Sequence, residues 1–379
     1  MKVLISCGGT GGHINPGLAI ADIIKSKYPD TEFLFAGTPK GMEAKLVPQA
    51  GYRMEAIKVA GFQRKISLEN IGRNIKAVAY LAASGKRARD IIKSFSPDIA
   101  IGTGGYAAGP VIRMAAKMGI PTAIHEQNAY PGVTNKLLSK EVDYVMLTVK
   151  EALDFMDRSR FEYSVTGLPV RSNINHVGKS EARRKLGFNN DFTILSFGGS
   201  LGAGCINETM TETVKWHFSK KLNINHIHGY GGMGKDTFPQ AMKAAGIPLK
   251  NSRLRISEYI NDMDICLAAA DLVICRSGAS TLAELEAAGK ASILIPSPIV
   301  AGNHQYHNAM VLGKAGAAEV IEQKDVTSEK IISEIEKLYK NPDKVSVMSQ
   351  NAASLHMNDT NERILSVIDK LIAKSVRTK

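Results

Sequence analysis

Short runs rich in apolar residues alternate with segments of helical periodicity along the whole chain. Strands that alternate with helices in this way predict parallel sheets covered by helices on both faces. The strand candidates occupy residues 3–6, 32–36, 99–101, 122–125 and 144–147 in the first half, and residues 193–197, 225–228, 272–275 and 292–295 in the second half.

Both halves begin in the same way, with a strand followed by a glycine-rich segment and a helical pattern. The two segments are CGGTGGHINP at residues 7–16, where the helix is expected to begin at Pro16, and GGSLGAG at residues 198–204. This repeat predicts an α/β protein with two Rossmann-like domains, residues 1–167 and 168–355. An amphipathic helix over about residues 356–379 is expected to pack back on the first domain.

The composition is that of a globular protein, with 44% hydrophobic and 22% charged residues in a chain of 379. No run approaches the roughly 18 apolar residues of a membrane span. The four cysteines show no metal-type spacing, and the N-terminus lacks the basic start and apolar core of a signal peptide. We therefore expect reduced thiols in a cytoplasmic protein.

The net charge of +12 is unevenly distributed, because residues 58–93 hold nine basic and two acidic residues. Apolar residues follow one helical face of this stretch. It therefore predicts either a surface helix with a solvated basic face or a helix that lies on an anionic membrane surface. Aromatic residues are too sparse there for stacking on single-stranded nucleic acid, and no nucleic-acid partner is expected.

The glycine-rich segments do not match two common nucleotide-binding patterns. Neither reads G-x-G-x-x-G, and no acidic residue ends the second strand of either half, which argues against NAD or FAD. A P-loop motif is also absent from the sequence. Each segment is either a purely structural turn or an anion site, since glycines allow close approach of a ligand and a helix N-terminus favours negative charge.

Polar or small residues follow the predicted strands 122–125 and 272–275, at the strand ends where ligands bind in such sheets. Three single residues have both a chemical and a structural interpretation. His13 follows the first glycines and is a candidate base near neutral pH, with local packing as the alternative. Glu284 either closes a capping box with Thr281, which the spacing favours, or accepts hydrogen bonds from a ribose. Asp262 is more consistent with a helix N-cap than with a metal ligand.

Taken together, the motifs of the chain resemble the MurG family of glycosyltransferases over its whole length. The resemblance rests on six motifs, in the order Gly8-Gly9-Thr10-Gly11-Gly12-His13, Gly104-Gly105-Tyr106, His125-Glu126-Gln127-Asn128, Gly198-Gly199-Ser200, Arg276-Ser277-Gly278-Ala279 and His304-Gln305. It implies a GT-B architecture, in which two Rossmann-like domains face each other across a cleft. The family transfers N-acetylglucosamine from UDP-N-acetylglucosamine to lipid I, an undecaprenyl-pyrophosphoryl-linked muramyl pentapeptide, and forms lipid II.

The resemblance also implies roles for particular residues. The second domain would bind the donor, with Glu284 on the ribose, which reverses the preference for a capping box. The first domain would bind the lipid acceptor. The implied donor contacts are Arg171, Ser200, Ile260, Ala279, Ser280, Thr281, Leu282, Ala283, Glu284 and Gln305, and the implied sugar and acceptor contacts are Thr10, Gly11, Gly12 and Asn128.

The implied reaction is an inverting displacement with His13 as the base and Glu126 as the second choice. It needs no metal and no cofactor, because helix N-termini and the loop around Ser200 would stabilise the leaving UDP. The expected location is the cytoplasmic face of the cell membrane, held peripherally. Leu201 departs from the family pattern, which has glutamine there, so one side-chain contact to the donor is in question.

Three other functions stay open at this stage. A related GT-B enzyme would glycosylate another lipid or a metabolite, or epimerise a UDP-sugar. A dinucleotide-dependent oxidoreductase is disfavoured by the missing fingerprint, and a non-catalytic sugar-nucleotide binder by the presence of both His13 and Glu284.

Overall fold

The computed structural model describes residues 1–59, 83–170, 174, 176–199, 201–249 and 251–378. The chain forms two compact units. Unit 1 consists of Met1–Pro169 together with Met357–Lys379, and unit 2 consists of Val170–His356. The chain thus leaves unit 1 near the predicted boundary at residue 167 and returns to it near residue 355.

Unit 1 is built on a seven-stranded parallel sheet with the order β3-β2-β1-β4-β5-β6-β7. β1 lies between β2 and β4, and its side chains alternate between two cores: Val3 and Ile5 face one side and Leu4 the other. The strands are β1 (Lys2–Cys7), β2 (Glu32–Gly37), β3 (Arg53–Ala56), β4 (Ile99–Gly104), β5 (Thr122–Glu126), β6 (Tyr144–Leu147) and β7 (Glu162–Val165).

Helices cover both faces of this sheet, as the alternating pattern predicts. The helices α1 (Gly11–Lys27) and α15 (Thr360–Thr378) pack on the Val3 side, whereas a helix through residues 83–95 and α4 (Ala108–Lys117) pack on the Leu4 side. The shorter helices of the unit are α2 (Glu43–Gln49), α5 (Val133–Leu138), η1 (Lys150–Phe155) and η2 (Arg158–Arg160).

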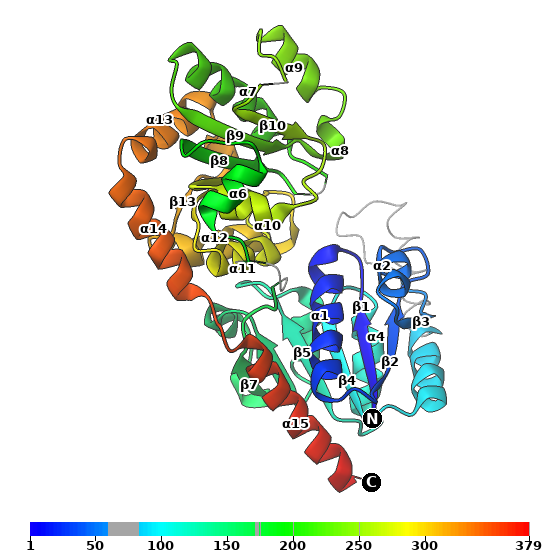
Figure 1. Cartoon of the computed structure of the whole chain (residues 1–379). Helices are drawn as coiled ribbons and strands as arrows, with labels where there is room; N and C mark the ends of the chain where they lie inside the picture. The colour runs from blue at the N-terminus through cyan, green and yellow to red at the C-terminus, as the bar shows by residue number, and fades with distance from the viewer. Residues whose placement is uncertain (60–82, 171–173, 175, 200, 250, 379) are drawn as a thin grey trace. The chain divides into compact units, whose positions relative to one another are not determined.

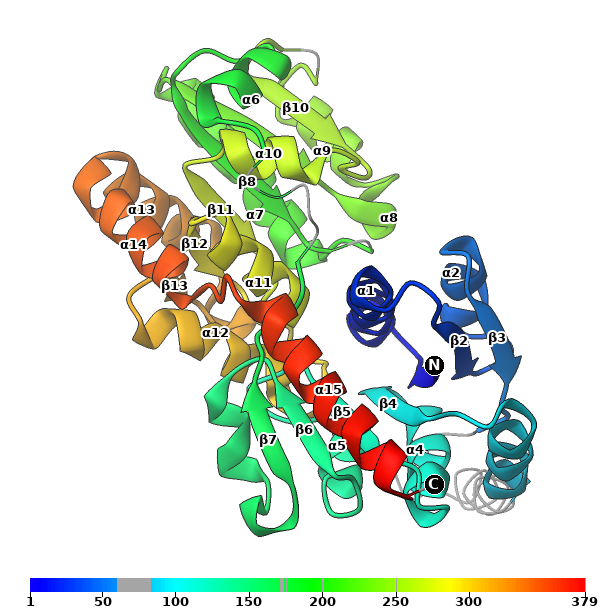
Figure 2. The same cartoon turned by 60° about the horizontal axis from the view of Figure 1, so that its bottom comes forward.

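Helix α15 follows unit 2 in the sequence but belongs to unit 1. It runs beside α1 and the strands β4, β6 and β7 (Figures 1 and 2). Ile364, Val367 and Ile368 are buried in the same core as Val3. Ion pairs and hydrogen bonds at its rim add to this packing, among them Lys27 Nζ to Asp369 at 2.7 Å.

Unit 2 contains a six-stranded parallel sheet with the order β10-β9-β8-β11-β12-β13. Its strands are β8 (Phe192–Phe197), β9 (Ile224–Gly229), β10 (Leu254–Ser257), β11 (Leu272–Cys275), β12 (Ala291–Leu294) and β13 (Ala318–Val320).

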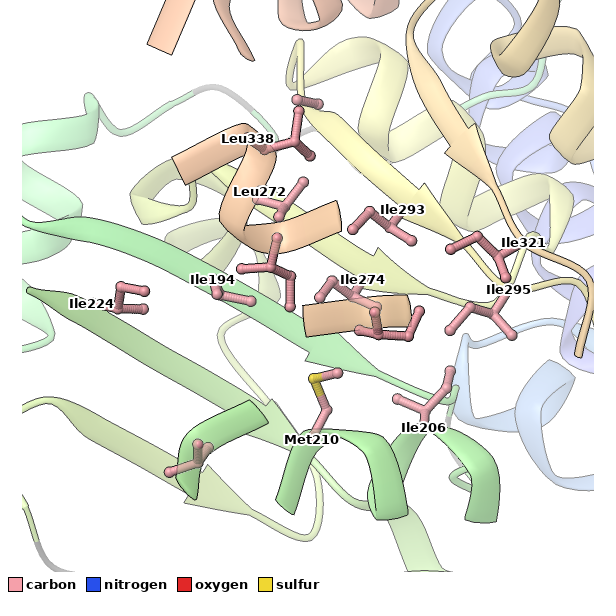
Figure 3. Close-up of a cluster of buried hydrophobic side chains, with 14 of the residues drawn as sticks. Ile194, Ile206, Met210, Ile224, Leu272, Ile274, Ile293, Ile295, Ile321 and Leu338 are labelled. Atoms are coloured by element: carbon pink, nitrogen blue, oxygen red, sulfur yellow. The ribbon is translucent and has the colours of Figure 1, made fainter. Parts of the chain in front are cut away.

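Two cores lie on the two faces of this second sheet. One is covered by α7 (Gly204–Ser219), α9 (Phe238–Ala244), α13 (Ser328–Tyr339) and α14 (Pro342–Leu355). Figure 3 shows its strand residues, such as Ile274 and Ile293, together with Ile206 and Met210 of α7. The other is covered by α10 (Met263–Ala269), α11 (Ala279–Ala287) and α12 (His304–Lys314). The remaining helices are α6 (Lys179–Lys185), α8 (Gly231–Gly234), η3 (Ala301–Asn303) and η4 (Gln323–Asp325).

The predicted fold class of two parallel-sheet, Rossmann-like domains is confirmed, and all nine predicted strands are present. Four strands were not predicted, namely β3, β7, β10 and β13, and each lies at the edge of its sheet. Within the described residues, no helix combines the length and apolar character needed to span a membrane.

The prediction that the first helix begins at Pro16 is wrong. Helix α1 begins at Gly11, with Thr10 in extended conformation as its N-cap, and the amides of His13 and Ile14 both bond to the Thr10 carbonyl. The glycines therefore form the first helical turn. Pro16 lies inside the helix, so its ring nitrogen leaves the Gly12 carbonyl without the usual partner.

Candidate functional site

A buried carboxylate holds the glycine loop at the end of β1. Glu43, the first residue of α2, is fully buried and accepts hydrogen bonds from the Gly9 amide (3.1 Å) and from the amide and hydroxyl of Thr38 (2.8 and 2.6 Å). A Cβ atom at Gly8 or Gly41 would lie 2.7 or 2.3 Å from its side chain. Burial acts to raise the pKa of Glu43, but these hydrogen bonds outweigh it and lower the pKa, so an ionised side chain clamps the loop.

His13 stands in the first turn of α1 and is fixed by two neighbouring strand ends. Its carbonyl accepts a hydrogen bond from the Thr103 hydroxyl (2.7 Å), and its Nδ1 lies 3.1 Å from Oε1 of Gln127. The ring sits against Gly104, where a Cβ atom would come within 2.7 Å of Nδ1 and where φ is +106°. Only glycine satisfies both conditions, so the ring is positioned by backbone as well as by side chains.

Behind His13, the end of β5 supplies a second histidine. His125 is completely buried, and its Nε2 lies 3.1 Å from the Gly167 carbonyl oxygen. The side-chain nitrogen of Gln127 reaches the His125 carbonyl oxygen (2.8 Å) and His125 Nδ1 (3.1 Å). Burial lowers the pKa of His125 to about 4, so its ring is neutral at neutral pH.

Glu126, the second candidate base, organises its own loop instead. Its side chain is 1% exposed. One oxygen accepts from the amide and the side chain of Asn128 (2.9 and 3.0 Å), and the other accepts from the Gly132 amide and the Asn135 side chain (3.0 and 2.9 Å). A buried carboxylate with both oxygens so occupied is poorly placed to take a substrate proton. Its hydrogen bonds to Asn128 fix the position of that residue, which the sequence predicts to contact the substrate.

In unit 2, the second glycine loop packs against the turn after β9. A Cβ atom at Gly202 would lie 2.2 Å from the Tyr230 carbonyl oxygen, and φ there is +84°. Leu201 is 71% exposed, and helix α7 begins at Gly204. The first amides of a helix have no partner within it, so this end of α7 is suited to a phosphate. Ser200 of this loop lies outside the described residues, as does Arg171.

The ends of β11 and β12 meet the start of α12 around Gln305. The Ser277 hydroxyl donates to the Gln305 carbonyl (2.8 Å), and the Gln305 side-chain oxygen accepts from the Ser297 amide (2.9 Å). Asn308 donates to the Ser277 carbonyl (3.3 Å). The two predicted motifs at residues 276–279 and 304–305 are therefore adjacent in unit 2.

Arg276 serves the fold at this point. It donates to the carbonyls of Ile295 and Pro296 (3.0 Å each) and to the Gln323 side chain (2.5 Å). The guanidinium thus ties the end of β11 to the end of β12 and to η4.

The predicted donor contacts from Ala279 to Glu284 are the first six residues of α11. Gly278 is the N-cap, and Thr281 is the third helical residue, so the capping-box interpretation of Thr281 and Glu284 is wrong. Leu282 and Ala283 are each 4% exposed and contribute to the interior, whereas Ala279, Ser280, Thr281 and Glu284 are half-buried at the end of the sheet where ligands bind.

Two other sequence predictions take a modified form. Ile260 is 7% exposed and belongs to the core of unit 2, with its side chain against Gly229 at the end of β9. Asp262 occupies the N-cap position of α10, but its side chain does not cap the helix and instead pairs with Arg255 at 2.8 Å.

In unit 1 the structure brings together Thr10, Gly11, Gly12, His13, Gln127 and Asn128. In unit 2 the described residues of the second glycine loop and residues 279–284 follow the neighbouring strands β8 and β11, and Gln305 bonds to Ser277 between β11 and α11. Sequence reasoning gave no role to Glu43 or Thr103, whose partners are distant along the chain. Gln127 belongs to the motif His125-Glu126-Gln127-Asn128, but the sequence assigns no function to its side chain. A Cβ atom at position 8, 37 or 41 would collide with the Glu43 side chain, so glycine is required at all three positions. These three glycines are the sequence signal by which the buried carboxylate could have been found.

Comparisons with known proteins identify relatives that span both units. The glycosyltransferase family 28 N-terminal domain matches residues 3–147, and the family 28 C-terminal domain matches residues 193–364. A protein of Acetivibrio thermocellus named UDP-N-acetylglucosamine--N-acetylmuramyl-(pentapeptide) pyrophosphoryl-undecaprenol N-acetylglucosamine transferase is 47% identical over 98% of both chains. A protein of Desulforamulus reducens with the same name is 42% identical over 99% of this chain and 100% of its own.

A solved structure supports the same assignment. The crystal structure of Acinetobacter baumannii MurG has a TM-score of 0.77 and 27% identity to this chain, covering 97% of this chain and 99% of its own. The architecture of both units, the matches to both family domains and the full-length relatives above 40% identity therefore support one family assignment. The chain belongs to glycosyltransferase family 28, within the MurG family.

Proposed function

We propose that this protein transfers N-acetylglucosamine from UDP-N-acetylglucosamine to lipid I and so forms the β-1,4-linked disaccharide of lipid II, a precursor of peptidoglycan. The observation that carries the proposal is the full-length relationship to proteins named for this transfer. The arrangement of His13 at a helix N-terminus, fixed by Thr103, Gly104 and Gln127, supports it independently.

Unit 2 is proposed to bind the donor. The diphosphate is assigned to the Gly198–Gly204 loop and the start of α7, with Ser200 and Arg171 as further contacts. The ribose hydroxyls would donate to Glu284, and the sugar hydroxyls would meet Gln305. The buried Ile260 would present its edge to the uracil, while residues 279–281 would contribute helix-start amides.

Unit 1 is proposed to bind the acceptor through Thr10, Gly11, Gly12 and Asn128. In the chemical step, His13 takes the proton of the attacking sugar hydroxyl. The hydroxyl oxygen forms a bond to the anomeric carbon, and the bond from that carbon to the diphosphate oxygen breaks. The electron pair leaves with UDP, whose developing charge the start of α7 would stabilise.

Peripheral attachment to the cytoplasmic face of the membrane is part of the proposal. The basic stretch 58–93 would contact anionic lipid headgroups. Residues 60–82 of this stretch lie outside the described residues. In the described remainder, Lys86, Arg89 and Lys93 are exposed on the helix through residues 83–95.

The test is a transfer assay with purified protein, UDP-N-acetylglucosamine and a lipid I analogue. We expect UDP release and disaccharide formation in equal amounts. A reaction without acceptor measures simple hydrolysis of the donor, and a reaction with UDP-glucose measures donor selectivity. UDP release without disaccharide, or conversion of the donor sugar to an epimer, would reject the proposal in favour of another sugar-nucleotide enzyme.

A further inference from the structure

We propose that Gln127 and His125 are positioning residues that hold His13 in the tautomer with its proton on Nδ1, which leaves a lone pair on Nε2. The tautomer follows from the hydrogen bonds of unit 1 alone. Its use, as the site that receives the proton of the acceptor hydroxyl, rests on the proposed function.

The first step concerns the orientation of the Gln127 amide. One end of this amide lies 2.8 Å from the His125 carbonyl oxygen, an atom that only accepts hydrogen bonds. That end must therefore be the nitrogen. The oxygen Oε1 is then the end that faces His13, and it too only accepts.

The second step concerns the proton of His125. Its Nε2 faces the Gly167 carbonyl oxygen at 3.1 Å, so Nε2 carries a proton and donates it. The ring is neutral, because its burial lowers its pKa to about 4, and Nδ1 therefore carries a lone pair. This lone pair accepts the second N–H of the Gln127 amide at 3.1 Å. Both protons of that amide nitrogen are thereby used.

The third step derives the protonation of His13 from the orientation of the Gln127 amide. Because Oε1 of Gln127 accepts, Nδ1 of His13 must donate, and the neutral ring has its lone pair on Nε2. The opposite tautomer would place two lone pairs face to face across 3.1 Å. The four contacts join His125 to the Gly167 carbonyl, Gln127 to the carbonyl and to Nδ1 of His125, and His13 to Gln127. A single assignment of protons gives each of these contacts one donor and one acceptor.

The chemical consequence is that His13 has an acceptor atom ready on the side of the ring away from Gln127. When Nε2 takes a proton, Nδ1 keeps its hydrogen bond, so the ring need not turn during the step. Gln127 is neutral, so it orients the ring without the charge that a carboxylate partner would add.

The direct test is nitrogen-15 NMR of the histidine-labelled protein, in a pH range where the His13 signals no longer change with pH. The His13 signals are assigned by their loss in His13→Ala. We expect the chemical shift of a protonated nitrogen at Nδ1 and that of an unprotonated nitrogen at Nε2. Gln127→Met removes the acceptor and should shift this population toward the opposite tautomer. Gln49→Met, an exposed position of the same unit, should leave it unchanged.

Kinetics supply the second readout. Gln127→Met should lower kcat for transfer by at least about tenfold while the KM for UDP-N-acetylglucosamine stays within twofold, because a general base contributes about 10²–10⁴-fold and the wrong tautomer forfeits part of that. A His13 ring that is protonated at Nε2 in the unaltered protein overturns the proposal, whatever its activity. A correct tautomer in a protein that does not glycosylate lipid I upholds the proposal and rejects the proposed function.

Discussion

Mild acid should destabilise unit 2, because three histidines are buried between its sheet and helix α7: His226 and His228 in β9, and His217 in α7. His217, His226 and His228 are each at most 1% exposed. The hydroxyl of Ser196 lies 2.9 Å from His226 Nε2 and 2.8 Å from His228 Nδ1. His217 lies beside them, with ring centroids 5.9 Å from His226, and within the described residues its Nε2 has no hydrogen-bond partner.

The magnitude follows from the pKa values. Burial, aided by the charge of Arg253, lowers the pKa of His217 from 6.5 to about 4, and burial lowers that of His228 from 6.5 to about 3. The folded pKa is below the unfolded one, so the unfolded chain binds more protons below pH 6.5 and stability falls as the pH decreases. At about pH 5 each of these two groups then costs about 2 kcal/mol, at about 1.4 kcal/mol per pH unit.

Together these two histidines remove about 4 kcal/mol from a domain stability that is typically about 5–15 kcal/mol. Burial, followed by the neighbouring His217 and His228, also lowers the pKa of His226 and adds in the same direction. Most of the loss falls between pH 6.5 and pH 4, the unfolded and folded pKa values of His217.

The assay is urea unfolding at neutral pH and near pH 5, followed by fluorescence of Trp216. This is the single tryptophan of the chain, and it lies in α7 of unit 2. His217→Phe should reduce the loss of stability on acidification by about 2 kcal/mol. His176→Phe, at an exposed position, is the matched control and should leave the loss unchanged. If His217→Phe loses as much stability as the unaltered protein, the assignment of acid sensitivity to this buried ring is refuted.

Four further outcomes are expected. His13→Ala should lower turnover by about 100-fold or more while calorimetry finds unchanged UDP-N-acetylglucosamine affinity; unchanged turnover would remove His13 as the base. Glu43→Gln should destabilise unit 1 by about 1–3 kcal/mol in chemical unfolding, since it places an NH₂ group against a donor, and a neutral effect would mean that the carboxylate is not needed. Ile368→Ala in α15 should cost about 2–5 kcal/mol in the same assay, and a loss below 1 kcal/mol would show that α15 adds little to this core. Replacing the exposed Lys86, Arg89 and Lys93 with Glu should weaken binding to anionic vesicles by about 1 kcal/mol for each residue and reduce the salt dependence of binding. Unchanged vesicle affinity would mean that this stretch is only a solvated basic face.

The strands that the sequence pattern revealed are those buried on both sides. Central strands such as β1 and β11 are continuous apolar runs because helices cover both of their faces. The four missed strands have a neighbour on one side only and are partly exposed. In β3 (Arg53–Ala56) and β7 (Glu162–Val165) no residue is buried, so the segments read as polar connections.

The candidate site was predictable to the extent that its residues share a local motif. The glycine loops and His13 could be found because strand, glycines and helix follow one another directly. The clamp at Glu43 depends on contacts to Gly9 across 34 positions, and the contact between His13 and Gln127 spans 114 positions. Sheet packing creates such pairs, and no periodicity in the sequence encodes them. The start of α1 was misjudged because Pro16 suits a first helical turn, whereas Thr10 provides the actual N-cap.

The position of α15 has a consequence for the order in which the chain is synthesised and folds. Asp369 bonds to Lys27 across 342 positions, and Ile364 and Ile368 complete the core that contains Val3. A growing chain therefore carries the sheet of unit 1 with one apolar face only partly covered, by α1, until α15 has been made. Unit 2 is one continuous segment and can finish folding before then. The half that is translated first is thus the half that is completed last.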